Sequence, residues 1–233
     1  MKKVQIWPII KGAFVDIYDN LGWVLFVSAI WFAFAVPFLF AILPGELSII
    51  LRILLGALVI FLGPATAGAY YLANKLIKRE SIEWRDFFFA FKKYFWRAEA
   101  LMMIFILAIV VIIIDFTFYS QIQNTIVKVL SIFWLYILIF LGVMQTYMFP
   151  LLIEQDTGIK KVIVRSFLLS IDNIGVSLVI FLIVTGLSVV CIITGVGALL
   201  LLMGVKSFFD TRTFLNVMEK YEGVPVPQKD KEG

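Results

Sequence analysis

The residues that decide the fold are EALMMIFILAIVVIIIDFTFYS, at positions 99–120. Apart from Glu99 and Asp115 the stretch is uncharged, and most of its side chains are large and apolar. About 20 such residues are needed to cross the hydrocarbon core of a bilayer, where an α-helix satisfies its own backbone polar groups. The stretch therefore predicts a membrane-spanning helix.

Five other stretches have the same character, and they cover residues 23–43, 47–73, 126–153, 173–194 and 196–216. Lys206, Asp210 and Arg212 interrupt the last one, so a single long helix over residues 173–203 is the competing interpretation. Because Lys206 and Asp210 stand four positions apart, they can pair on a helix and reduce the cost of entering the membrane. With 62% hydrophobic and 15% charged residues, the composition also indicates a lipid environment. We predict an all-α transmembrane bundle with six spans, five being the alternative.

The distribution of positive charge favours six spans. Cytoplasmic loops of membrane proteins collect Lys and Arg. With six spans and both termini in the cytoplasm, every basic residue except Arg52 and Lys128 lies on the cytoplasmic side. With five spans, the basic residues from Lys206 onward would move outside. We therefore expect a multi-pass protein of the plasma membrane with both termini cytoplasmic.

A short amphipathic segment precedes the first, third and fifth spans, at residues 8–19, 84–98 and 158–172. In the first segment Phe14 is followed by Asp19-Asn20, and in the third Phe167 is followed at the same offset by Asp172-Asn173. The middle segment has Phe91 at the equivalent position but lacks the Asp-Asn pair. This spacing predicts three parallel repeats of an interfacial helix and a two-span hairpin, over residues 8–76, 84–155 and 158–217. The alternative is that any amphipathic helix entering a membrane looks similar.

The repeats together make one transmembrane domain over residues 1–221. Residues 222–233 combine two prolines with mixed charge, which predicts a flexible cytoplasmic tail.

The most unusual motif is the stretch GPATAGAY at positions 63–70, in the second span. Pro64 removes a backbone hydrogen bond and kinks the helix. The small residues of the motif allow another helix to approach closely. Two interpretations follow: tight packing around a kink, which we favour, or a broken helix whose free carbonyl groups bind a solute. The motif residues are Gly63, Pro64, Ala65, Thr66, Ala67 and Tyr70.

Ionisable residues near the bilayer are few. Asp115 lies toward the outer end of its span, and Arg52 is a candidate partner at similar depth, so the two could form a polar site. Glu99 and Glu154 stand at the inner boundary, where we expect them to reach water or pair at the surface.

The segment before the third span interleaves basic and aromatic residues. Because its aromatic side chains fall on one helical face, contact with anionic lipid headgroups explains the pattern better than nucleic-acid binding. The residues of this interfacial helix are Arg85, Phe87, Phe88, Phe91, Lys92, Lys93 and Arg97.

Catalytic and metal-binding signatures are missing from the sequence. The chain has no histidine and a single cysteine, Cys191, and it contains no nucleophile elbow, phosphate-binding loop or HExxH motif. We therefore expect no enzymatic activity, no cofactor and no metal.

The combination of Gly63–Ala67, Tyr70, the Arg85-Asp86-Phe87-Phe88 element and Asp19-Asn20-Leu21-Gly22 resembles the YesL-like family of bacterial membrane proteins. Many members carry Asn where this chain has Ser28, which speaks against a polar role at that position. The resemblance implies a bacterial plasma-membrane protein without an established activity. It also implies a role beside carbohydrate uptake systems, near which members are often encoded.

Two functions remain open at this point. The first is an accessory or regulatory protein that binds another membrane protein, such as a transporter subunit, through the small-residue face of the second span or the cytoplasmic helices. The second is a small-solute transporter or channel that uses the kinked second span.

Overall fold

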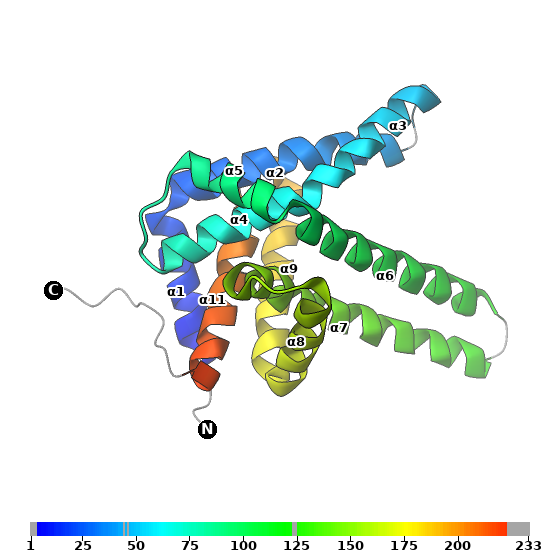
Figure 1. Cartoon of the computed structure of the whole chain (residues 1–233). Helices are drawn as coiled ribbons and strands as arrows, with labels where there is room; N and C mark the ends of the chain where they lie inside the picture. Colours follow the sequence, from blue (N-terminus) through cyan, green and yellow to red (C-terminus); the bar gives the residue numbers. More distant parts are fainter. Residues whose placement is uncertain (1–3, 44, 46, 123–124, 223–233) are drawn as a thin grey trace.

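The computed structural model describes residues 4–43, 45, 47–122 and 125–222, and all regular structure in these ranges is helical (Figure 1). The helices are α1 (Ile6–Asp19), α2 (Leu21–Ile42), α3 (Ile49–Ala57), the 3₁₀ helix η1 (Leu58–Phe61), α4 (Leu62–Ile77), α5 (Trp84–Lys93), α6 (Phe95–Gln121), α7 (Thr125–Gln155), α8 (Ile159–Asp172), α9 (Ile174–Thr194), α10 (Val196–Leu200) and α11 (Leu202–Glu222). The prediction of an all-α bundle is confirmed. Within the described residues, five stretches are long and apolar enough to span a membrane: Leu21–Ala41, Ile49–Ile77, Phe95–Gln121, Ser131–Gln155 and Ile174–Thr194.

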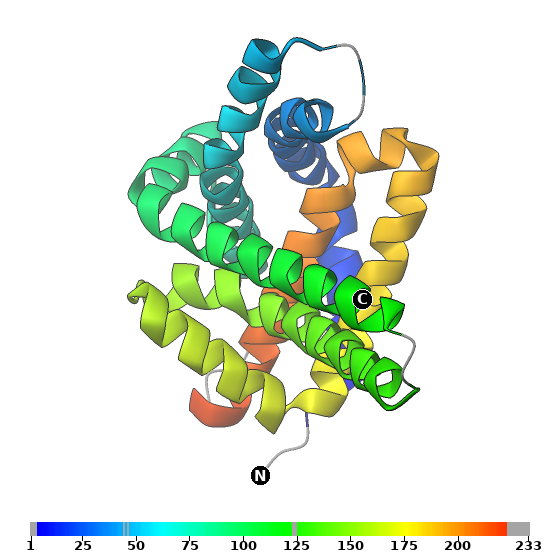
Figure 2. The ribbon, with the colours of Figure 1, turned by 90° about the vertical axis from the view of Figure 1, so that its right-hand side faces the viewer.

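The same order of short and long helices occurs three times along the chain. A short helix (α1, α5 or α8) leads into a long helix (α2, α6 or α9), and the chain then returns through α3, η1 and α4, through α7, or through α10 and α11. Seen from the side that carries the turns, the three hairpins point in different directions (Figure 2). This order is the one that the repeat hypothesis describes.

The junctions after α1 and α8 have the same local structure. Asn20 has φ −122° and ψ 30°, and Asn173 has φ −126° and ψ 33°. Each asparagine side chain donates a hydrogen bond to a carbonyl group four residues earlier, at 2.8 Å to Asp16 O and 3.2 Å to Leu169 O. The Asp-Asn pairs that match in sequence therefore make the same bend between a short helix and a span.

The second span is interrupted, as its proline leads one to expect. Its α-helical hydrogen bonding gives way to η1 immediately before α4, and Pro64 lies in the first turn of α4. Pro64 cannot donate to the carbonyl group four residues earlier, at Ile60, and its ring crowds that group. The chain accommodates this by tightening into a 3₁₀ turn.

The sixth predicted span is not one apolar helix. The chain turns at Gly195, whose φ of 65° ends α9, so the alternative of one long helix over residues 173–203 is wrong. After the short α10, helix α11 runs back beside α9 in the opposite direction (Figure 1). It packs against α1, α2, α4, α7 and α9 and so lies at the centre of the bundle.

The two ends of the described chain lie at the same end of the molecule. Helix α1 packs along α11, and the first turn of α1 lies near the last turn of α11 (Figure 1). An even number of membrane crossings places both ends of a chain on the same side. Apart from Glu222, which ends α11, the tail predicted over residues 222–233 lies outside the described residues.

Helices α2 and α11 approach each other unusually closely. Gly204 lies against the backbone of Val24, and its N–H, which is free in the first turn of α11, donates a hydrogen bond of 2.8 Å to Ser28 Oγ. Ser28 is buried and caps the central helix from a neighbouring helix. The expectation that this serine has no polar role is therefore wrong.

Replacing Gly204 by alanine should destabilise the bundle. The new Cβ would lie 2.7 Å from the carbonyl oxygen and 2.9 Å from the Cα of Val24, and backbone atoms cannot rotate away. Such overpacking costs about 1–3 kcal/mol, so the thermal unfolding midpoint in detergent should fall.

Gly186 of α9 provides the control, because a Cβ there would meet nothing within 4 Å. Alanine favours a helix over glycine by up to about 1 kcal/mol, so Gly186→Ala should keep or raise the midpoint. Equal losses in both variants would contradict the close approach of α2 and α11.

Candidate functional site

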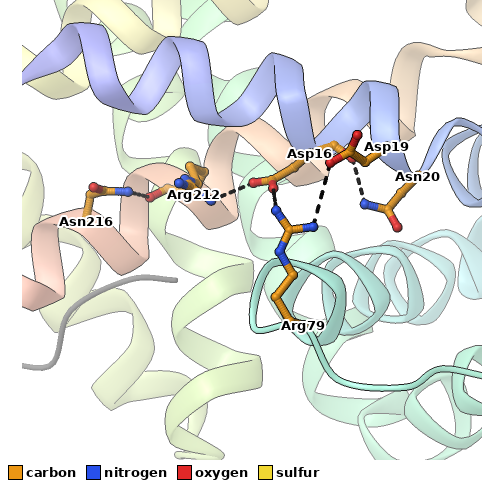
Figure 3. A network of polar contacts seen from close by, with 6 residues as sticks. All are labelled: Asp16, Asp19, Asn20, Arg79, Arg212 and Asn216. Atoms are coloured by element: carbon orange, nitrogen blue, oxygen red, sulfur yellow. Dashed lines mark hydrogen bonds and ion pairs between the residues drawn. The ribbon is translucent and has the colours of Figure 1, made fainter. Parts of the chain in front are cut away.

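The most distinctive feature of the core is a network of charged side chains that joins three helices (Figure 3). Arg212 of α11 donates a hydrogen bond of 2.7 Å to Asp16 Oδ2 of α1, and the side chains of the two residues are 5% and 1% exposed. Arg79, just after α4, reaches the other carboxylate oxygen of Asp16 at 3.2 Å and also pairs with Asp19 at 3.8 Å. The network joins the last turn of α1 and the middle of α11 to the end of α4.

The chain makes room for the Arg212 side chain. A Cβ on Gly12 of α1 would lie 2.7 Å from the guanidinium nitrogens Nε and Nη2. The carbonyl oxygen of Arg212 accepts a hydrogen bond of 2.8 Å from Asn216, one turn further along α11. Within the described residues, Nε of Arg212 has no hydrogen-bond partner. The position of the guanidinium group therefore depends on Asp16 and on the small residue opposite it.

Asp16 lies in α1, outside the apolar spans. Burial raises the pKa of its carboxyl group, and the charges of Arg212 and Arg79 counteract part of this shift. A buried carboxylate without partners would cost several kcal/mol. Asp16 can therefore carry a charge in the core only because the two guanidinium groups lie beside it.

A second polar group lies on α11 two residues before Arg212, on another face of the helix. Asp210 is fully buried, accepts a 2.6 Å hydrogen bond from the hydroxyl group of Tyr70 in α4, and pairs with Lys206 at 2.8 Å. The predicted pairing of Lys206 with Asp210 is confirmed. Both contacts use Oδ2, and Oδ1 has no hydrogen-bond partner within the described part of the chain. Asp210 thus couples the central helix to the motif of the second span.

Glu99 occupies a place that the sequence does not indicate. Its side chain accepts a hydrogen bond of 3.1 Å from the N–H of Gly63, and Glu99 is only 7% exposed. The N–H groups in the first turn of a helix have no intrahelical partner, and a carboxylate is favourable there. The expectation that Glu99 reaches water or a surface partner is wrong, because it caps α4. Glu154 does pair at the surface, with Lys78 at 2.6 Å.

The small-residue motif of α4 faces the interior of the chain. Gly63, Pro64, Ala65, Thr66, Ala67 and Tyr70 are all buried. A Cβ on Gly63 would lie 2.6 Å from the Cα of Glu99, so α4 and α6 are in close contact at this point. Thr66 accepts a hydrogen bond of 2.9 Å from the indole of Trp31 and donates one of 2.8 Å to Leu62 O. The motif serves packing within the bundle, and its small-residue face is covered by the chain's own helices.

The structure does not bring Asp115 and Arg52 together. The guanidinium group of Arg52 donates to four backbone carbonyl groups around the turn between α2 and α3, those of Leu47, Ala41, Leu43 and Gly45, at 2.7–3.3 Å. Asp115 lies on α6 and is partly exposed. Among the described residues it has neither a hydrogen bond nor an ion pair, so the predicted pair with Arg52 is wrong.

The basic and aromatic residues before the third span form α5 and the first turn of α6. Phe87 is fully buried against Gly68, and Phe91 lies beside it in a cluster of rings, whereas Phe88 is 42% exposed. Lys93 and Arg97 pair with Asp156 at 2.8 and 2.7 Å. Arg85 lies over the ring of Trp84, and Lys92 is exposed. The aromatic face is therefore divided between the core and the surface.

The ion pairs of Asp156 also affect its ionisation. The hydrogen bond from Lys93, more than any other contact, lowers the pKa of Asp156, and Arg97 adds to the effect. Asp156 lies in the connection between α7 and α8, and its side chain is 44% exposed, so solvent weakens these pairs.

One comparison with known proteins gives a match. Residues 17–116 match the family described as "Protein of unknown function, DUF624". The matched segment contains the Gly63–Ala67 and Arg85–Phe88 elements, and it agrees with the resemblance to the YesL-like family of unknown function. No curated protein and no solved structure matches the chain.

Sequence reasoning missed Asp16 and Arg79 as members of a charged core. One signal was present: Asp16 lies on the same face of its helix as Ile9 and Ala13, and both of these are buried. A charge on an apolar face indicates a partner in the core. Nothing in the sequence indicates that this partner lies 196 positions away.

Replacing Asp16 by asparagine should strongly destabilise the protein, because Arg212 would stay buried without a carboxylate partner. Breaking a buried pair in this way costs about 3–5 kcal/mol. Asp156→Asn is the matched control, because its pairs are partly exposed and should be worth less than about 1 kcal/mol. Unfolding of both variants in detergent measures the difference, and equal losses would contradict a core role for Asp16.

Proposed function

We propose that the protein is an accessory or regulatory subunit of a membrane transport system in the bacterial plasma membrane. The observation that carries the proposal is the contrast between the two halves of the bundle. The half that contains α11, α4 and α1 is packed and held by buried ion pairs. The outer parts of the hairpins diverge (Figures 1 and 2), and many of their apolar side chains are exposed.

The clearest free surface is one face of α6. Its apolar side chains Leu107, Val111, Ile114 and Phe118 are 47–63% exposed and recur at helical spacing. Contact with lipid alone would be enough to cover such an apolar face. Asp115 lies beside it, however, six residues before the end of a 27-residue helix.

A carboxyl group at this place favours a partner with positive charge. The ring of Tyr119 stacks on Trp134 of α7 one turn further out, and such aromatic pairs mark the membrane boundary. Asp115 would then lie about 6 Å below that boundary, since a helix rises about 1.5 Å per residue. Ionisable groups inside a membrane are usually paired. A Lys or Arg on a helix of another membrane protein would supply the pair.

The resemblance to the YesL-like family suggests which transport system the partner belongs to. Members of that family are often encoded near carbohydrate uptake systems, so a permease subunit of such a system is the proposed partner. The small-residue face of α4 takes no part, because it is buried within the bundle. The anionic headgroups that we expect near α5 would contact the opposite end of the molecule.

Asp115→Asn should release the partner. Asparagine keeps the size and removes the charge that the partner's cation needs, so the amount of copurified permease should fall at least tenfold in gentle affinity purification from native membranes, measured by mass spectrometry. Thr117→Ala is the control, because the Thr117 hydroxyl donates a hydrogen bond within its own helix, at 2.8 Å to Ile114 O. Asp115→Glu should keep the partner.

A second candidate is a small-solute transporter or channel. It is favoured by the buried Asp210 and Tyr70 at the centre, with the partly buried Lys206 beside them, because ionisable groups inside a span often line proton or solute pathways. If the wild-type protein purifies without any partner, the accessory proposal fails. Solute uptake into reconstituted vesicles then becomes the measurement to make.

A further inference from the structure

A small pocket lies between α7, α8 and α11, at the end of the bundle where the short helices gather. It has a volume of about 230 Å³ and is lined by Leu151, Gln155, Arg165, Leu168, Leu169, Met218 and Tyr221. Most of its wall is apolar. An apolar cavity of about 150 Å³ is enough to hold a benzene molecule, so this pocket can take part of a hydrocarbon chain.

The walls of the pocket are held in place by hydrogen bonds. The hydroxyl group of Tyr221 accepts from Asn173 at 3.1 Å and donates to Asp172 at 3.3 Å. On the opposite side, the guanidinium group of Arg165 donates a hydrogen bond to the side-chain oxygen of Gln155. The pocket therefore belongs to the folded bundle, since residues of three helices fix its shape.

Three faces can be distinguished on helix α8, and the pocket opens beside this helix. Val162, Ser166 and Ser170 are buried against the bundle. A second face exposes apolar side chains: Val164, Phe167, Leu168 and Ile171 are 44–54% exposed. Lys161 and Arg165, four residues apart, form a basic stripe between these two faces, and Lys160 lies at the start of the apolar face; all three are exposed. A helix with such faces lies in the membrane interface, its apolar face toward the acyl chains.

The positive charge of this corner has no counterion among the residues that the structure describes. Lys160, Lys161 and Arg165 form no ion pair with any described residue, whereas the neighbouring Asp156 and Glu154 already pair with Lys93, Arg97 and Lys78. Arg165 stands at the rim of an apolar pocket, next to the exposed side chain of Leu168. A ligand that fits has an anionic group at one end and a hydrocarbon chain at the other.

We propose that this pocket binds an anionic phospholipid. One acyl chain enters between α8 and α11 past Leu168, and the phosphate group accepts hydrogen bonds from Arg165, with Lys160 and Lys161 near the headgroup. The bound lipid joins α8 to the last turns of α11. The proposal does not depend on a partner protein, and it adds a specific site to the general attraction between basic helices and anionic membranes.

The test is native mass spectrometry of the delipidated protein in detergent, titrated with phosphatidylglycerol and, separately, with phosphatidylcholine of the same acyl chains. The wild type should retain one phosphatidylglycerol at concentrations at which phosphatidylcholine is lost. Arg165→Gln removes the charge at the rim and should weaken that binding about tenfold, since hydrogen bonds to charged groups are strong. Arg165 is exposed, so this variant should fold.

A second variant tests the pocket itself. Met218→Trp places a larger side chain in the pocket wall and should weaken phosphatidylglycerol binding with Arg165 intact, with its unfolding midpoint measured alongside. Lys11→Gln is the matched control, because it removes one positive charge from an exposed position on α1, outside the pocket lining, and it should change the affinity less than twofold. Equal losses in Lys11→Gln and Arg165→Gln, equal binding of both lipids, or undiminished binding by folded Met218→Trp would each overturn the proposal.

Discussion

The pairing of Arg212 with Asp16 is the interaction on which the rest of the structure depends. Helix α11 carries more charge than any other helix at the centre of the bundle, and it can lie there only because its charged groups find partners on other helices. Arg212 pairs with α1, and Asp210 accepts a hydrogen bond from α4. These two contacts set the position and rotation of α11. The remaining helices pack around it.

The same arrangement explains why the molecule is compact at one end and divergent at the other. The polar contacts of α11, the Ser28 cap and the Glu99 cap all connect the inner parts of the helices. Toward their turns, the hairpins carry apolar side chains that lipid or another apolar helix can cover equally well. A bundle of this kind is suited to binding in the membrane, which is the physical basis for proposing an accessory role over a catalytic one.

Much of the fold follows from the sequence, and most of the core network does not. Apolar length predicts the spans, Pro64 predicts the break before α4, and the four-residue spacing predicts the Lys206–Asp210 pair, because these features depend on neighbours in the chain. Glu99 is predicted at the surface from its place at the inner boundary, and Asp16 is not predicted as a core residue, because their partners lie 36 and 196 positions away. Hydropathy likewise makes α11 a weak candidate for a membrane span. It treats Asp210 and Arg212 as exposed charges, whereas both are buried and paired.

The membrane topology tests this account most directly, since it requires α11 to be a sixth crossing enclosed by the others. In a Cys191→Ser background, single cysteines at Gly45, Gly158 and Glu222 would be labelled with a membrane-impermeant maleimide in intact and in opened cells. The account predicts that positions 158 and 222 react from one side of the membrane and position 45 from the other. Reaction of position 222 from the same side as position 45 would mean five crossings, and it would contradict a central spanning α11.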